Sequence, residues 1–250
     1  MSYEILTLQK HPELQSEVDQ FAAYWPPFML QEQYSKQYWE SLKYIFPDYQ
    51  YAMIDPTSGE VVARGLSLPI AWDHTNDGLP TGWGQAHELA FEQYKTGKQP
   101  NTLCALEITL KPELRGLGLS RRMIEAMKEI AKSHGFDNLI APVRPSLKSQ
   151  YPLISIEAYL QRTMSLSSDE PFDPWIGIHW RLGAKILKLA PASMTVEDTV
   201  AQWKRWTDIN FPTSGLYVVK GALVPVDINL ENDRGTYVEP NVWMLHSINT

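Results

Sequence analysis

The clearest alternation of apolar and polar positions in this chain lies in residues 119–133. Apolar side chains recur there every three or four positions, which predicts an amphipathic helix that buries one face. His134 and Gly135 follow the last apolar position and end that helix. A strongly apolar run precedes the helix at 103–110, and a shorter one follows it at 139–143. The pattern therefore predicts a strand, a helix and a second strand in direct succession.

Elsewhere the same pattern predicts a series of shorter elements. Strands are expected at 3–8, 49–54, 60–68, 185–189, 216–219 and 224–228, helices at about 11–24, 31–45, 85–95, 154–161, 175–182 and 197–206, and a polar loop at 165–174. This order of elements, with a hairpin near the start, indicates a mixed α/β sheet. It differs from the regular strand–helix alternation of a doubly wound fold.

The domain organisation follows from the absence of any internal repeat or linker. We expect one domain over residues 1–250, with an extended C-terminal segment from about residue 185. Two stretches of this segment, 207–216 and 231–241, are expected to be loops. They could shape the substrate site or form the contact of a homodimer.

The composition narrows the class of protein. The chain is 44% hydrophobic and 20% charged, as is usual for a globular protein, and its net charge of −7 argues against a general nucleic-acid-binding surface. The single cysteine, Cys104, excludes an internal disulfide and is expected to be a buried small hydrophobe. The chain has neither a signal-like N-terminus nor an apolar run of about 18 residues, so we expect a cytoplasmic protein that does not enter a membrane.

The most specific motif connects the strand at 103–110 to the helix at 119–133. It is Arg115-Gly116-Leu117-Gly118-Leu119-Ser120, in which two glycines lead into a helix N-terminus whose free amides attract anions. The segment lacks the lysine of a P-loop, and Arg121 stands where a dinucleotide fingerprint has its third glycine. A diphosphate remains the best candidate ligand, and Arg121 and Arg122 could neutralise further phosphate charge.

This segment resembles the acyl-CoA-binding motif of the GNAT acetyltransferase superfamily, Gln/Arg-x-x-Gly-x-Gly/Ala, with Ser120 at the last position. The resemblance implies a mostly antiparallel sheet whose two central strands, 103–110 and 139–143, splay apart between flanking helices. It also implies that acetyl-CoA binds along the first of these strands. Its pantetheine would bond to the backbone near Ile108 and Leu110, and its diphosphate would lie on the amides of Arg115, Gly116, Leu117, Gly118, Leu119 and Ser120.

A second point of resemblance involves His179. Members of this superfamily often carry Tyr-x-x-x-Gly-Phe, whose tyrosine lies near the thioester sulfur and can protonate the leaving thiolate. This chain has His179-Trp180-Arg181-Leu182-Gly183-Ala184, with the same spacing and a histidine in the tyrosine's position. An imidazole can act as acid, base or oxyanion donor, and the alternative is a structural histidine in the core.

Glu107 is the candidate for the group that deprotonates the amine, because superfamily members often take that residue from the cofactor strand. A cross-strand role is equally compatible with its place in the pattern. His87, Glu88, Asp73 and His74 are alternatives, and Arg144 could contact the acyl group or an acidic substrate. No histidine pair has ligand spacing on one element, so no metal site is expected.

The resemblance implies an enzyme that transfers an acetyl or other short acyl group from acyl-CoA to an amine by direct attack in a ternary complex. The acceptor could be a small molecule or carrier-bound. Two alternatives remain open. His179 in place of tyrosine resembles GNAT-like domains that decarboxylate malonyl-CoA and pass acetyl to a carrier thiol. The chain could also be a non-catalytic acyl-CoA sensor.

Overall fold

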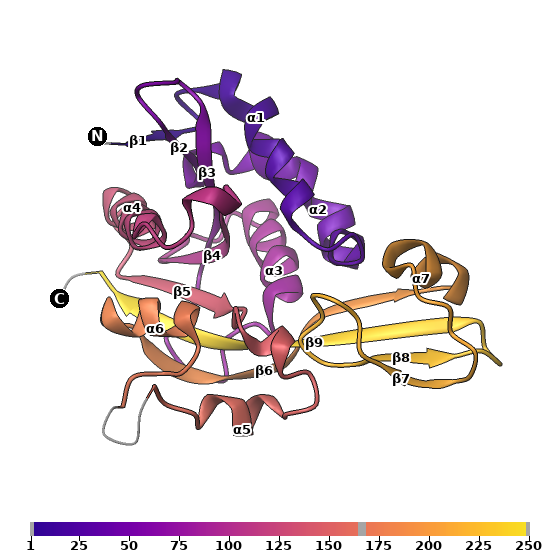
Figure 1. The fold of residues 1–250 in the computed structure, drawn as a ribbon. Helices are drawn as coiled ribbons and strands as arrows, with labels where there is room; N and C mark the ends of the chain where they lie inside the picture. Colours follow the sequence, from indigo (N-terminus) through magenta and orange to yellow (C-terminus); the bar gives the residue numbers. More distant parts are fainter. Residues whose placement is uncertain (1–2, 165–168, 249–250) are drawn as a thin grey trace.

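The computed structural model describes residues 3–164 and 169–248. Within them, nine strands form one sheet in the order β1-β2-β3-β4-β5-β9-β8-β7, and β6 also pairs with β9 (Figure 1). The strands are β1 (Glu4–Thr7), β2 (Gln50–Ile54), β3 (Val61–Ile70), β4 (Thr102–Leu110), β5 (Asn138–Val143), β6 (Lys185–Asp198), β7 (Gly215–Tyr217), β8 (Val226–Asn229) and β9 (Arg234–Ser247). Only β4 and β5 pair in parallel among them. The predicted mixed, mostly antiparallel sheet is therefore confirmed.

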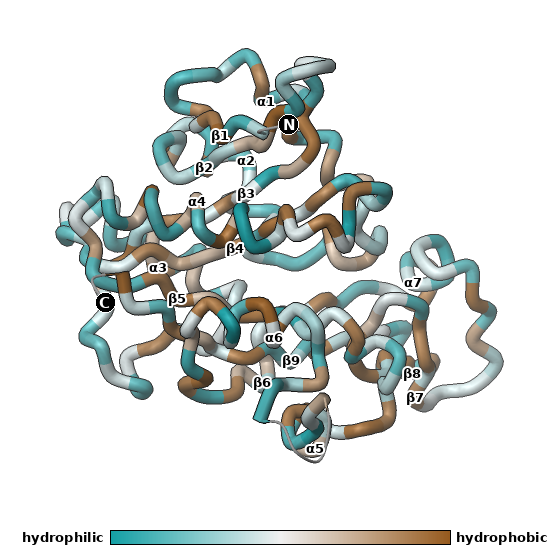
Figure 2. Tube along the Cα trace, turned by 60° about the vertical axis from the view of Figure 1, so that its left-hand side comes forward, coloured by the Kyte–Doolittle hydropathy of each residue, from teal (hydrophilic) through white to brown (hydrophobic). Residues whose placement is uncertain are grey.

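Helices flank this sheet. They are α1 (Gln15–Asp19), α2 (Gln33–Ile45), α3 (Trp83–Lys95), α4 (Leu119–Ser133), α5 (Ile156–Leu160), α6 (Pro174–Arg181) and α7 (Val200–Thr207). Short 3-10 turns lie at Pro12–Leu14, Gln20–Tyr24, Met29–Gln31, Pro47–Tyr49, Pro112–Leu114 and Lys148–Gln150. Helices α2 and α3 pack on one face of β3 and β4, and α4 packs on the other. Figure 2 shows β1–β4 with α1, α2 and α4 in the upper part of the view and β6–β9 in the lower part.

Strands β4 and β5 separate after a short paired stretch. Their parallel pairing covers only Thr102–Cys104 and Asn138–Ile140 among the described residues. Beyond Cys104, β4 continues on its β3 side through a bulge, because Leu66 pairs with Glu107 and Ser67 with Ala105. The resulting splay leaves the β5-facing backbone of β4 without a strand partner, as the family resemblance implied.

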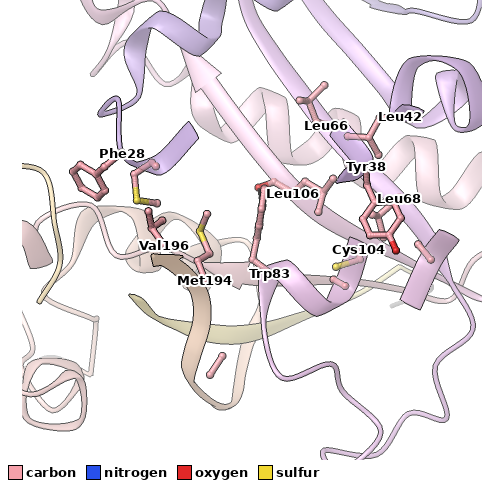
Figure 3. Close-up of a cluster of buried hydrophobic side chains, with 14 of the residues drawn as sticks. Phe28, Tyr38, Leu42, Leu66, Leu68, Trp83, Cys104, Leu106, Met194 and Val196 are labelled. Atoms are coloured by element: carbon pink, nitrogen blue, oxygen red, sulfur yellow. Dashed lines mark hydrogen bonds between the residues drawn. The ribbon is translucent and has the colours of Figure 1, made fainter. Parts of the chain in front are cut away.

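The largest core cluster fills the face of the sheet covered by α2 and α3. Figure 3 shows Trp83 between one group around Leu106 and Cys104 and a second group formed by Met194 and Val196. Cys104 is fully buried, and burial raises the pKa of its thiol. The prediction of a buried, unreactive cysteine is confirmed.

The C-terminal part differs most from the expected elements. The stretch 231–241, expected to be a loop, includes the start of β9, a 14-residue strand that pairs with β5, β6 and β8. Its pattern is hard to interpret because Glu239 and Asn241 are polar yet buried, and Pro240 stands between them. Strand β6 likewise runs to Asp198, so α7 begins later than expected. Residues 165–168 of the expected loop lie outside the described residues.

The buried histidine of α3 makes stability depend on pH. Burial lowers the pKa of His87 to about 4, against the opposing effect of the Trp83 carbonyl, 3.1 Å from Nδ1. Only the unfolded chain then takes up a proton as the pH falls below about 6.5, so this stability is present above that pH and lost towards pH 4. We expect a loss of about 3 kcal/mol over this range from the shift in this pKa. Denaturant unfolding measured between pH 7 and pH 4 tests this. The free energy of unfolding of His87→Gln should fall less steeply with decreasing pH than that of the unsubstituted protein, and equal pH dependences would contradict the prediction.

Candidate active site

A cavity of about 920 Å³ lies where β4 and β5 separate. Side chains from both faces of the sheet line it. On the α4 face these are Ser120, Ile124 and Met127; on the face of α1 and α2 they are Asp19, Trp39 and Glu40. The cavity therefore reaches both faces of the sheet, which allows two substrates to meet from opposite sides.

The arginine–glycine loop forms one end of this cavity. Gly116 and Gly118 have φ values of 82° and 78°, and a Cβ on either would meet nothing within 4 Å. The glycines are therefore required by backbone conformation and not by close packing. Gly118 is the N-cap of α4 and provides no side-chain cap, so the first amides of a 15-residue helix remain available to an anion.

The arginines of this region are not equivalent. Arg115 lines the cavity together with Ser120. Arg121 instead pairs with Glu125 at 2.8 Å, and Arg122 donates to the Tyr3 carbonyl at 2.9 Å. The side chain that can add positive charge beside the amides is thus Arg115.

Gly118→Ala tests the loop conformation. Alanine at positive φ costs about 1–2 kcal/mol, which should either strain the loop or change its shape, and we expect about tenfold weaker coenzyme A binding by calorimetry. Gly97→Ala is the matched control, because Gly97 has φ 68°, open space around it and a position outside the cavity. A loss of affinity in both variants, or in neither, would contradict a specific role of the loop.

Strand β4 contributes backbone groups to the cavity. Ile108 and Leu110 of β4 both line the cavity, beyond the point where β5 stops pairing. Their β5-facing amide and carbonyl groups can therefore bind an extended ligand as an added strand would. This position agrees with the strand contacts that the resemblance implied.

Helix α6 holds His179 at the cavity wall. Asp173 caps the helix by accepting from the amides of Trp175 and Ile176, and it also accepts from the Tyr159 hydroxyl and the Leu147 amide. Gly183, at φ 84°, ends the helix in the manner of a C′ glycine. The N-cap and the C′ glycine thus limit α6 to eight residues.

His179 itself is 3% exposed and lines the cavity. Its Nδ1 lies 2.9 Å from Nε2 of His246 on β9, and Trp175 packs edge-on against its ring at 4.6 Å. Its Nε2 is buried and has no hydrogen-bond partner in the described part of the chain. Burial, with a contribution from His246, holds the pKa of His179 well below its usual value, so the imidazole is neutral.

Glu107 also lines the cavity, but its carboxylate is already bound. Arg64 donates from Nε and Nη2 to the two oxygens at 2.7 and 2.9 Å, and the Thr109 hydroxyl donates at 2.5 Å. Both members of the ion pair are buried. A bidentate buried pair favours a structural role, since proton uptake by Glu107 would leave the charge of Arg64 uncompensated.

The other residues that the sequence suggested for the site do not lie together. Arg144 lines the cavity, but its Nε lies 2.9 Å from the buried Glu239. His87, Glu88 and the pair Asp73–His74 do not line it. Among the described residues, no group of three or more His, Cys, Asp or Glu side chains could hold a metal ion.

Sequence reasoning missed three residues of this region: Arg64, Asn241 and His246. Each is a polar residue in a strand whose neighbours are largely apolar. A polar residue in such an apolar run is the signal that could have identified them, because burial of its side chain requires a hydrogen-bond or ion-pair partner. The partners Glu107 and His179 lie 43 and 67 positions away in the sequence, which periodicity does not reveal.

No family model matches the chain. Its fold is similar to the loading GNATL domain of CurA from Lyngbya majuscula, with a TM-score of 0.60 at 18% identity over 99% of this chain and 98% of that one. It is also similar to the GphF GNAT-like decarboxylase in complex with isobutyryl-CoA, with a TM-score of 0.59 at 13% identity over the whole of both chains. At these identities the likeness concerns the fold alone.

A curated relative decides the family. The arginine N-acetyltransferase avaD of Aspergillus versicolor is 31% identical over 270 residues, covering 98% of this chain and 90% of the relative. The chain belongs to the GNAT superfamily. This GNAT protein is an N-acetyltransferase-type enzyme that moves an acyl group from acyl-CoA to an amine, and the decarboxylase alternative is not favoured. Within the described residues of this GNAT enzyme, no helix is long and apolar enough to cross a membrane.

Proposed function

We propose that the enzyme transfers an acetyl group from acetyl-CoA to a nitrogen of arginine or of a small molecule that carries its guanidinium group. The observation that carries this proposal is the cavity that reaches both faces of the sheet between β4 and β5. The relative named as an arginine N-acetyltransferase supports the choice of acceptor.

The donor would enter on the α4 face. Its diphosphate would lie on the amides of Arg115 through Ser120, and its pantetheine would bond to the open backbone of Ile108 and Leu110. This arrangement extends the thioester along β4 towards His179, which lines the same cavity. Holding the thioester and the amine in one cavity lowers the entropic cost of their reaction.

The acceptor would enter on the opposite face, where the charge of the walls suits a cation. Asp19 and Glu40 line the cavity there together with Lys36, and Lys43 donates to Oε2 of Glu40 at 2.6 Å. The buried Arg64 and the partly buried Arg144 are each neutralised by a glutamate. Asp19, whose Oδ1 accepts from the Gln15 amide, thus has no ion-pair partner among the described residues, and it would favour a guanidinium or ammonium group over an anion.

Catalysis would require little beyond positioning and one proton transfer. The bound cation first releases one proton to solvent, and the resulting neutral nitrogen attacks the thioester carbonyl. The carbon–sulfur bond then breaks, and the thiolate takes up the second proton that the nitrogen loses. His179 is the group that we assign to protonate the sulfur, because its Nε2 is buried at the cavity wall without a partner among the described residues. Arg64 and Glu107 would instead support the wall against which the acceptor lies.

Arginine and citrulline form the direct test of this proposal. They have nearly the same shape, and only arginine carries the charge. With acetyl-CoA we expect arginine to be acetylated and citrulline to be a poor acceptor, with mass spectrometry locating the acetyl group. The double variant Asp19→Asn, Glu40→Gln should raise KM for arginine and leave KM for acetyl-CoA unchanged. Equal use of both acceptors, or release of CO₂ from malonyl-CoA without acetylation of arginine, would contradict the proposal.

A further inference from the structure

A second buried histidine lies directly behind His179. His246 comes from β9, 67 positions later, and is 1% exposed. The facing nitrogens, Nδ1 of His179 and Nε2 of His246, lie 2.9 Å apart. The contact therefore has the length of a hydrogen bond between two imidazole rings. Any part that His246 takes in catalysis rests on the proposed role of His179 at the thioester.

A hydrogen bond between two neutral imidazoles contains one proton, and its position determines the chemistry at the cavity. When His246 donates, Nδ1 of His179 is bare and its Nε2 carries a proton. When His179 donates from Nδ1, its Nε2 is bare and accepts a proton. The two tautomers thus make His179 either a donor or an acceptor towards the substrates.

The surroundings of His246 keep its ring neutral. Burial lowers the pKa of His246 to about 4 and Lys128 lowers it further, whereas the backbone of Leu182 raises it. Nδ1 of His246 is buried and has no hydrogen-bond partner in the described part of the chain. A neutral His246 with its proton on Nδ1 can accept at Nε2 from Nδ1 of His179.

The balance of protons favours the second tautomer, in which His179 donates from Nδ1. A neutral His179 that began by giving away its Nε2 proton would become an imidazolate or need a further proton through the buried pair. A bare Nε2 needs neither, because it takes up a proton before it gives one away.

We propose that His246 is a positioning residue that accepts the Nδ1 proton of His179, so that Nε2 of His179 faces the substrates as the proton acceptor. As the carbon–nitrogen bond forms, Nε2 takes the proton that the acceptor nitrogen must lose. The carbon–sulfur bond then breaks with its electron pair going to sulfur, and the proton on Nε2 passes to the thiolate. One proton thus moves from nitrogen to sulfur, and His179 returns to its starting state.

Ring-nitrogen NMR of the free enzyme tests the tautomer without any turnover. Long-range ¹H–¹⁵N correlations at neutral pH, assigned through His179→Ala and His246→Gln, should show His179 protonated on Nδ1 and bare on Nε2. A proton on Nε2 of His179 would overturn the proposal.

Two substitutions of His246 separate positioning from packing. Phenylalanine cannot accept the Nδ1 proton, so His246→Phe should lower kcat by about 10- to 100-fold with KM for acetyl-CoA unchanged. Glutamine can accept through its side-chain oxygen, so His246→Gln should recover most of kcat. His87→Phe is the matched control, because it removes an equally buried imidazole that does not contact His179.

The outcomes are distinguishable from a failure of the proposed function. Full activity of His179→Ala would refute the role of His179, while the NMR experiment would still decide the tautomer. If His246→Phe does not fold, the His246→Gln variant and the NMR spectrum decide the proposal. A folded His246→Phe with unchanged kcat would overturn the role of His246.

Discussion

Replacing His179 by alanine is expected to lower kcat by about 100- to 1,000-fold, the usual contribution of one positioned proton-transfer group. Its ring lines the cavity and has a buried Nε2 without a partner in the described part of the chain. The arginine–glycine loop, to which we assign the diphosphate of coenzyme A, lies on a different element, so coenzyme A affinity should hardly change. Steady-state kinetics and calorimetry measure the two effects separately.

Two comparisons secure this prediction. His179→Gln preserves a polar side chain and cannot carry a proton between substrates, so its kcat should fall as far as that of the alanine variant. His87→Gln alters a buried histidine that does not line the cavity, and its kcat should match that of the unsubstituted enzyme. A His179→Ala enzyme with unchanged kcat would remove the assigned role.

Removal of the Glu107 carboxylate is expected to destabilise the fold by about 3–5 kcal/mol. Glu107→Leu would leave the guanidinium of Arg64 buried and unpaired, although Nη1 would retain its bond to the Val18 carbonyl. In denaturant unfolding, the denaturant concentration at the midpoint should fall, while the dependence of the unfolding free energy on denaturant concentration should not change. Arg64→Met should cost a similar amount, because it leaves the carboxylate unpaired.

The double variant Arg64→Met, Glu107→Leu separates structure from catalysis. It removes both charges, and we expect most of the lost stability to return, since a buried ion pair often contributes little relative to apolar side chains of similar volume. If Glu107 is structural, the double variant should retain kcat within a few-fold. A stable double variant with a loss of kcat of about 100-fold would instead identify Glu107 as the base.

The local elements were largely predictable because each depends on neighbours in the sequence. Helix α4 begins and ends where its apolar repeat and His134-Gly135 indicate. The predicted glycine loop before this helix is present, and Gly116 and Gly118 both adopt positive φ in it. Strand β9 was missed because Glu239 and Asn241 are buried through contacts with Arg144 and with each other, and such partners cannot be seen in a local pattern.

The sequence by itself predicted the family, which the curated relative confirms, and the conformation of the arginine–glycine loop. Both depend on a short contiguous motif, in which backbone conformation and the start of a helix follow from the residue types. Only the tertiary structure decided which side chains act in pairs. Arg64 meets Glu107, and His246 meets His179, because the sheet brings distant strands together and excludes the water that would otherwise solvate these groups. Burial, and not residue type, makes His179 neutral and binds the carboxylate of Glu107 to Arg64.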